Sequence, residues 1–281
     1  QRGLACLRRF AAQLTQSGVQ QVRAVATQTL REAQNRNAFL LQAQAALGHP
    51  IEVIAGREEA RLIHVGVAHL QPSSAPRLVI DIGGRSTELI LARGDKPVAV
   101  ESFAVGSVSL SMRYFPDGRL TAQAFRKAQV AAGAEFEEGL TIFGRAHWRE
   151  ALGSSGTAGA VSEVLQANGI TDGTITPAGL QTLIERCIAA GHIDKIELAG
   201  LKEDRRAVIP GGLSLLYTLA AQFGIDALKP AKGALRQGVI IELHERLRAQ
   251  RLGTQAGQRD ARLATVRTLQ KRFAVDTTQA Q

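Results

Sequence analysis

The sequence predicts an α/β protein, and three features of the chain support this prediction. Strand and helix patterns alternate over residues 1–70, as they do in α/β folds. Three strand-like runs then follow one another as an antiparallel meander. The 28 glycines fit many tight turns between such elements. With 281 residues, 45% of them hydrophobic, the chain can build about two domains with ordinary cores.

Residues 1–70 contain helical spacings of apolar residues and two short strand patterns. Leucines at helical spacing predict a helix that ends at Gly18, and residues 22–27 are typical of a buried strand. We expect one long helix over residues 28–47, stopped by Gly48 and Pro50. Residues 51–54 form a short strand pattern, and Gly56 opens a further helix that extends to residue 70.

A segment rich in proline and serine, residues 71–76, indicates a domain boundary. The meander that follows comprises strands at 78–83, 87–92 and 98–105. We then expect short strands near 150–153 and 225–228, and helices over 121–143, 157–167, 177–190, 205–223 and 234–250.

The composition limits the classes of partner and compartment. A net charge of +9 and a pI near 10.2 predict a polyanionic partner. Cys6 and Cys187 are the only cysteines and lie far apart, so we expect neither a disulfide scaffold nor a zinc site, and a reducing cytoplasm. Apolar runs stay below the 18 residues of a membrane span, and we expect no membrane partner.

The segment LVIDIGGRSTELILA, residues 78–92, concentrates acidic, glycine and hydroxyl residues at one reversal of the chain. Glycines allow a positive φ and remove side chains, so that successive amides can converge on a phosphate. Asp81 and Glu88 repel phosphate unless Mg²⁺ stands between them. A plain hairpin turn without a ligand is the alternative interpretation.

Two further glycine turns follow. Residues 153–157, Gly153-Ser154-Ser155-Gly156-Thr157, precede a predicted helix whose first amides suit an anion. The alternative there is an ordinary N-cap by Ser155 or Thr157. At residues 210–212 a Pro-Gly-Gly stretch interrupts a helical pattern, and we expect a kink rather than a ligand contact.

Taken in order, these segments resemble the Ppx/GppA family of exopolyphosphatases and guanosine pentaphosphate phosphohydrolases. The resemblance runs from Gly3 to Leu247 and is carried by VRAVATQTLREAQNRNAFL, IEVIAGREEARLIHVGV, VIDIGGRSTELIL, GSSGT and KGALRQGVI. It implies an actin-like (ribonuclease H-like) two-domain fold. Residues 1–70 would belong to an incomplete first domain, 71–250 to the second, and 251–281 to a short helical C-terminal tail.

The resemblance also implies roles for single residues. Glu59 would activate the attacking water, while Asp81 and Glu88 would hold Mg²⁺ and help to place that water. Residues implied in phosphate contacts are Gly83, Gly84, Arg85, Ser86, Gly153, Ser154, Ser155, Gly156 and Thr157. Arg85 replaces the third glycine of the family's turn. If that position needs a positive φ, arginine costs roughly 1 kcal/mol, and its guanidinium either pairs with phosphate or blocks the turn.

Four functions stay open at this point. The first is Mg²⁺-dependent exopolyphosphatase activity, and the second is hydrolysis of guanosine pentaphosphate by the same chemistry. The third is a non-catalytic phosphate-binding protein, because the family's first phosphate turn, D-L-G-S-N-S, does not occur in a chain that begins at Gln1 and is expected to lack upstream residues. The fourth is an actin-like kinase or chaperone ATPase. We expect no specific nucleic-acid site, and a homodimer is an open expectation.

Overall fold

The computed structural model of the chain describes residues 1–251. The chain divides into two compact units, Gln1–Val239 and Ile240–Gln281. Helix α11 (Leu235–Arg251) begins in the first unit and ends in the second. The tail expected over 251–281 lies, apart from Arg251, outside the described residues. Among the described helices, none combines the length and apolar character needed to cross a membrane.

The N-terminal part contains a small parallel sheet. Strands β1 (Ala24–Ala26) and β2 (Ile51–Val53) pair from Ala24 opposite Ile51 to Ala26 opposite Val53. Helix α1 (Arg2–Gln16) precedes β1, and α2 (Gln28–Glu32) and α3 (Arg36–Leu47) connect the two strands. The single helix expected over 28–47 is therefore wrong. The backbone becomes extended at Ala33, with ψ 123°, which ends α2 after Glu32.

The main sheet has five strands in the order β5-β4-β3-β6-β7. The expected meander is confirmed, because β3 (Pro76–Ile82), β4 (Thr87–Arg93) and β5 (Lys96–Phe103) pair in antiparallel register. Strands β6 (Glu150–Ser154) and β7 (Leu228–Pro230) add in parallel on the other side of β3. The last strand thus begins three residues later and ends two residues later than expected.

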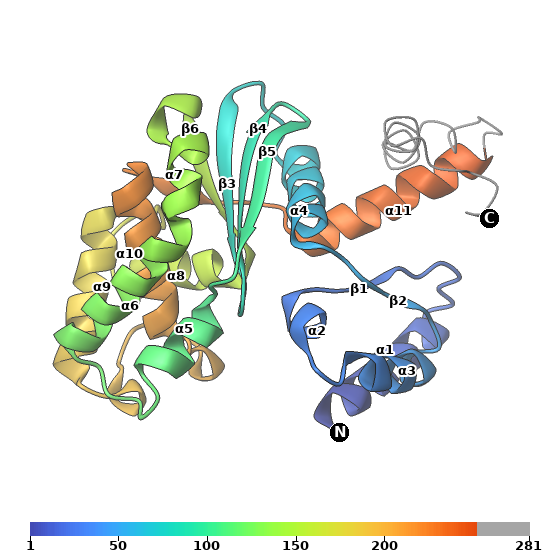
Figure 1. Cartoon of the computed structure of the whole chain (residues 1–281), viewed down its shortest axis with the longest axis horizontal. Helices are drawn as coiled ribbons and strands as arrows, with labels where there is room; N and C mark the ends of the chain where they lie inside the picture. The colour runs from blue at the N-terminus through green and yellow to red at the C-terminus, as the bar shows by residue number, and fades with distance from the viewer. Residues whose placement is uncertain (252–281) are drawn as a thin grey trace. The chain divides into compact units, whose positions relative to one another are not determined.

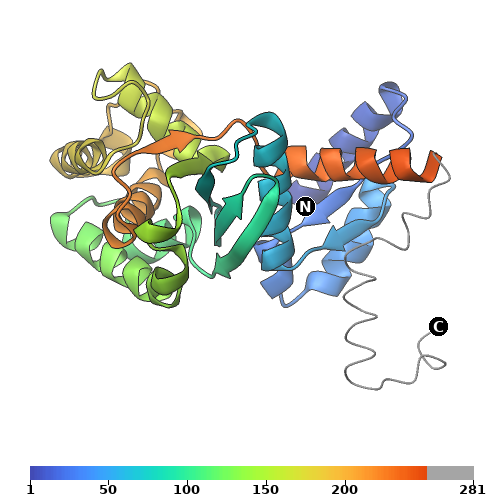
Figure 2. The ribbon, with the colours of Figure 1, turned by 90° about the horizontal axis from the view of Figure 1, so that it is seen from above.

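Helices cover both faces of this sheet, as Figures 1 and 2 show. Helix α4 (Gly56–Leu70), which has the expected bounds, packs Ala60, Ile63 and Val67 against Val79 and Ile90 on one face. The larger core on the opposite face is closed by α5 (Ser107–Tyr114), α6 (Ala122–Phe136), α8 (Ser155–Ala167), α9 (Pro177–Ala190) and α10 (Ile209–Phe223).

Three helical expectations need correction. The helix expected over 121–143 is divided into α6, a 3₁₀ turn at Glu137–Gly139, and α7 (Leu140–Phe143). The helix expected from 205 begins at Ile209, so Pro210 occupies its first turn, where proline needs no hydrogen bond, and causes no kink. Gly211 allows a close approach to α5, since a β-carbon there would lie 2.3 Å from the Ser107 carbonyl oxygen. Helix α5 itself was not predicted.

Short 3₁₀ turns complete the described chain at Arg145–His147, Ile193–Lys195 and Glu203–Arg205. The first of these leads into β6, and the last precedes α10.

Candidate active site: a buried carboxylate cluster beside two turns

Two acidic residues lie side by side at one end of the main sheet. Asp81 on β3 is directly opposite Glu88 on β4. Ser154 on β6 is the next partner of Asp81, and Ser102 on β5 is the next partner of Glu88. Because side chains at paired positions share one face of a sheet, these four residues form a row on the face that α4 covers. The Ser102 hydroxyl donates a hydrogen bond to Glu88 Oε1 at 2.8 Å.

Glu59 joins this row from the first turn of α4. Close packing at Gly56 makes this possible, because a β-carbon at that position would lie 2.5 Å from the Ser102 side chain. Arg31 of α2 fixes the carboxylate by donating from Nη1 to Glu59 Oε2 at 3.0 Å and to the Ile54 carbonyl oxygen at 2.8 Å. Glu59 therefore faces the sheet carboxylates instead of pointing into solvent.

All three carboxyl groups have raised pKa values. Burial is the main cause for Glu59, opposed by Arg31, and for Asp81, opposed by the hydroxyls of Ser155 and Ser154. Burial, and next the charge of Glu59, raise the pKa of Glu88 to about 8. Three acidic residues that are each at most 7% exposed thus share one low-dielectric site with one arginine.

The first turn, residues 83–86, is held by the start of α5. The amides of Ser107 and Val108 donate to the carbonyl oxygens of Gly83 and Gly84, each at 2.9 Å. Gly106 is needed for this approach, because a β-carbon there would lie 2.4 Å from the amide nitrogen of Arg85. The carbonyls of the turn are therefore occupied.

The amides of that turn have a different environment. Gly83 N–H donates to the Ser86 carbonyl oxygen at 2.9 Å and closes the hairpin. Within the part of the chain that the structure describes, the N–H groups of Gly84, Arg85 and Ser86 donate to no protein acceptor. These are three backbone donors in sequence, beside the carboxylates.

The backbone of the first turn corrects one expectation. Neither glycine has a positive φ, and Arg85 does not have one either, so the condition under which arginine would be strained at this position is not met. The Arg85 side chain is half exposed, and its Nη2 lies 3.4 Å from Glu32 Oε2. Ser86 is buried and helps to lower the pKa of Glu88 through a hydrogen bond.

The second turn, residues 153–157, leads from β6 into α8. Ser155 is the single non-glycine residue with a positive φ (68°) among the described residues. The hydroxyls of Ser155 and Thr157 donate to the Ile82 carbonyl oxygen at 3.1 and 2.9 Å. Ser154, the residue before the helix, makes no side-chain cap and donates to the Gly233 carbonyl oxygen. The alternative of a cap by Ser155 or Thr157 is therefore wrong.

Two glycines shape this second turn. A β-carbon at Gly153 would lie 2.6 Å from that of Ala158, so the turn is tight. A β-carbon at Gly156 would lie 2.6 Å from Nη2 of Arg205. The Arg205 guanidinium has no salt bridge to a described carboxylate and lies beside the first turn of α8. Its positive charge adds to that of the helix N-terminus, which suits an anion.

The carboxylates fit a magnesium ion in the way that phosphate-processing sites use it. No group of three His, Cys, Asp or Glu side chains among residues 1–251 is arranged as a ready metal site. Mg²⁺, however, is commonly held by one or two carboxylates while water and substrate phosphates supply the remaining oxygens. Asp81 and Glu88, adjacent and buried, match that pattern.

Sequence reasoning missed several residues of this site. Arg31, Ser102, Gly56 and Arg205 come from four separate segments, and packing alone brings them to the carboxylates or to the second turn. The sequence contained one usable signal, which was the arginine in TLREA. It lies within the first segment that resembles the Ppx/GppA family.

Comparison with known proteins defines the class. The Ppx/GppA phosphatase family matches residues 1–247, and the chain belongs to this family. Two curated relatives from Vibrio cholerae serotype O1, each named guanosine-5'-triphosphate,3'-diphosphate pyrophosphatase, are 39% identical over 277 residues. These matches cover 99% of this chain and 54% of each relative, so the chain spans about half of their length.

Solved structures support the fold. An exopolyphosphatase from Cytophaga hutchinsonii ATCC 33406 is similar with a TM-score of 0.72 and 22% identity, over 87% of this chain and 81% of that chain. The Aquifex aeolicus PPX-GPPA enzyme gives a TM-score of 0.68 and 22% identity, over 85% and 81%. The expected α/β architecture of the Ppx/GppA proteins is thus confirmed.

Proposed function

We propose that the chain hydrolyses a terminal phosphoanhydride bond in a Mg²⁺-dependent reaction, with Glu59 as the base. One observation carries this proposal. Glu59, Asp81 and Glu88 share a buried site next to three backbone amides that donate to no acceptor among residues 1–251. Backbone amides attract phosphate, whereas carboxylates repel it unless a divalent cation lies between them. A site that combines these amides with carboxylates therefore suits a phosphate chain that binds together with a divalent cation.

In this proposal, each group of residues has a separate role in binding or catalysis. The amides of Gly84, Arg85 and Ser86 bind the oxygens of the terminal phosphate, and Arg205 with the start of α8 binds the adjacent phosphate. Glu59 accepts a proton from water, and the water oxygen attacks the terminal phosphorus in line. The bond between that phosphorus and the bridging oxygen breaks, and the shortened substrate leaves with the bridging oxygen. Inorganic phosphate is the second product.

Burial supports the role of Glu59. The raised pKa makes its carboxylate a stronger base than an exposed glutamate, while the hydrogen bond and charge of Arg31 oppose this rise and favour the ionised form. Asp81 and Glu88 would hold the Mg²⁺ ion, whose positive charge would offset the negative charge on the phosphoryl oxygens. The carboxylate of Glu88 also helps to place the water, since it lies near Glu59.

The preferred substrate in this proposal is guanosine-5'-triphosphate,3'-diphosphate. It is supported by the name of the two Vibrio cholerae relatives at 39% identity. Linear polyphosphate, placed first on sequence grounds, is the second candidate. The net charge of +9 favours it, because a long polyanion gains from distributed positive charge.

The test is phosphate release from both substrates by the full 281-residue chain, with Mg²⁺ and with EDTA. We expect Mg²⁺-dependent release, with kcat/KM at least tenfold higher for the nucleotide. Release from polyphosphate alone would overturn the substrate preference. Absence of release from both, by a folded sample, would favour the non-catalytic phosphate-binding alternative. ATP consumption that requires an added sugar would instead indicate a kinase.

A further inference from the structure

A cavity lies at the other end of the main sheet from the carboxylate cluster. It has a volume of about 320 Å³ and opens where β6 and β7 begin. Arg77, near the start of β3, is four residues from Asp81, or about 13 Å along the strand. Between these ends the sheet carries apolar residues under α4, including Val79 and Ile90. The cavity is therefore separate from the carboxylate cluster.

The lining of this cavity is positively charged. Its three cationic side chains, none of which forms a salt bridge with a carboxylate of the described residues, are Arg145, Arg149 and Lys229. The lining carboxylate of Glu150 is already engaged by the buried Arg77, whose Nε lies 2.8 Å from Glu150 Oε2.

Two more carboxylates bear on this charge. Asp226 lines the cavity and is the acidic group left to face the three cations. Asp172 lies outside the lining. It feels the charge of Lys229, but it already accepts a hydrogen bond from the Thr174 amide at 2.9 Å. Cations thus outnumber the available carboxylate around one cavity.

One cation is fixed before any ligand arrives. The Arg145 guanidinium lies 4.4 Å above the Trp148 ring and donates to the Trp148 carbonyl oxygen at 2.9 Å. Trp148 is in turn anchored by its Nε1, which donates to the Phe143 carbonyl oxygen at 2.9 Å. Since Arg145 covers this ring, the ring offers no stacking surface for a nucleobase.

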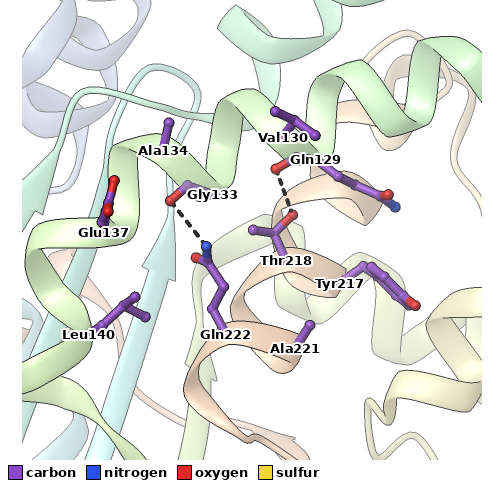
Figure 3. A pocket seen from close by; sticks show the side chains of 10 residues that line it. All are labelled: Gln129, Val130, Gly133, Ala134, Glu137, Leu140, Tyr217, Thr218, Ala221 and Gln222. Carbon is purple, nitrogen blue, oxygen red and sulfur yellow. Dashed lines mark hydrogen bonds between the residues drawn. The ribbon is translucent and has the colours of Figure 1, made fainter.

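A different concavity, between α6 and α10, has no such character (Figure 3). Glu137 is its one charged lining residue. Gln222 and Thr218 already use their donors on the carbonyl oxygens of Gly133 and Gln129. The positive charge is a property of the Arg145 cavity and not of concave surfaces in general.

We propose that the Arg145 cavity is a binding site for an oligophosphate anion, distinct from the catalytic carboxylates. Two guanidinium groups and an ammonium group from two segments of the chain match an extended phosphate chain better than one phosphate. The covered Trp148 ring means that phosphates, and not a base, are recognised. The anion is an inorganic oligophosphate or the phosphate chain of a nucleotide.

Trp148 makes the site measurable, because it is the only tryptophan of the 281 residues. Its emission is followed while inorganic tripolyphosphate is added, in EDTA and at constant ionic strength. We expect a saturable change. The double variant Arg149→Ala/Lys229→Ala should weaken binding at least tenfold. Arg126→Ala/Lys127→Ala, an equal charge change at exposed positions of α6, should leave it unchanged.

Asp81→Asn separates this site from the catalytic one and should retain the response. The same titration with guanosine 5'-triphosphate tests whether a nucleotide is preferred, and we expect this nucleotide to bind no more tightly than tripolyphosphate. A response reproduced by sodium chloride, a response lost in Asp81→Asn but kept in Arg149→Ala/Lys229→Ala, or a tenfold preference for the nucleotide would each overturn the proposal. The measurement needs no turnover, so failure of the proposed hydrolysis does not decide it.

Discussion

Glu88 gives the sharpest test of the electrostatics of the carboxylate cluster. It is 1% exposed, and it faces Glu59 on α4 and Asp81 on β3, with hydroxyl donors from Ser102 and Ser86. Burial, followed by the charge of Glu59, raises its pKa from 4.5 to about 8. A glutamine at this position keeps the shape and the acceptor for Ser102 but removes the charge.

The sign follows from proton linkage. In the unfolded chain Glu88 loses its proton near pH 4.5, whereas the folded protein keeps it until about pH 8. Between these values the folded state binds more protons, so the free energy of unfolding falls as pH rises. Between pH 4.5 and pH 7 the free energy of unfolding falls by at most about 3 kcal/mol for this reason, at about 1.4 kcal/mol for each pH unit. Below pH 4.5 the effect vanishes.

We therefore expect Glu88→Gln to be more stable than the unmodified protein at pH 7, by up to about 3 kcal/mol, and equal to it near pH 4. The assay is urea denaturation in EDTA across this range, with Glu138→Gln at an exposed position as the control. Added Mg²⁺ should raise the stability of the unmodified protein more than that of Glu88→Gln. A variant that is less stable at every pH would refute this reasoning.

Three further predictions concern the groups around the carboxylates. Gly56→Ala should lower both stability and phosphate release, because its β-carbon would meet Ser102, whereas Gly159→Ala, which meets nothing within 4 Å, should be neutral or slightly stabilising in thermal denaturation. Arg31→Met should raise the pKa of Glu59 further, so the acid limb of the pH–rate profile should move to higher pH; an unmoved limb would exclude Glu59 as the group that titrates. Arg205→Ala should raise KM for the nucleotide about tenfold or more while kcat changes less, and an unchanged KM would remove Arg205 from the site.

Local sequence signals predicted most of the sheet and its nearest helix. The β-rich runs around Val79 and Ile90, separated by a glycine turn, predicted β3 and β4 because strand pairing across a short turn depends on neighbouring residues. The bounds of helix α4 were also predicted, because Gly56 at its start and the helical spacing of its apolar residues are local signals.

Elements that depend on distant contacts were missed. Helix α5 contains three serines in eight residues, and its first amides are satisfied by the carbonyls of Gly83 and Gly84, more than twenty residues earlier. The break after α2 comes at Ala33, two residues after Arg31, and the partners of Arg31, Ile54 and Glu59, lie 23 and 28 residues further on. No local pattern reports such contacts.

The site shows the same division. Glu59, Asp81 and Glu88 were identified through motifs, and the structure brings them together as expected. Their surroundings were not predictable, because Ser102 reaches Glu88 across the pairing of β4 with β5. Arg205 reaches Gly156 from a segment 49 positions away in the sequence.

The most direct measurement is phosphate release by Glu59→Gln, with binding of the nucleotide measured on the same sample. We predict that kcat falls by a factor of about 10² to 10⁴, the usual contribution of a general base, while the Kd of the nucleotide changes by less than about fivefold, because the turn amides and Arg205 are unaltered. Unchanged kcat in Glu59→Gln would contradict the assignment of Glu59 as the base and, with it, the reaction proposed for this site.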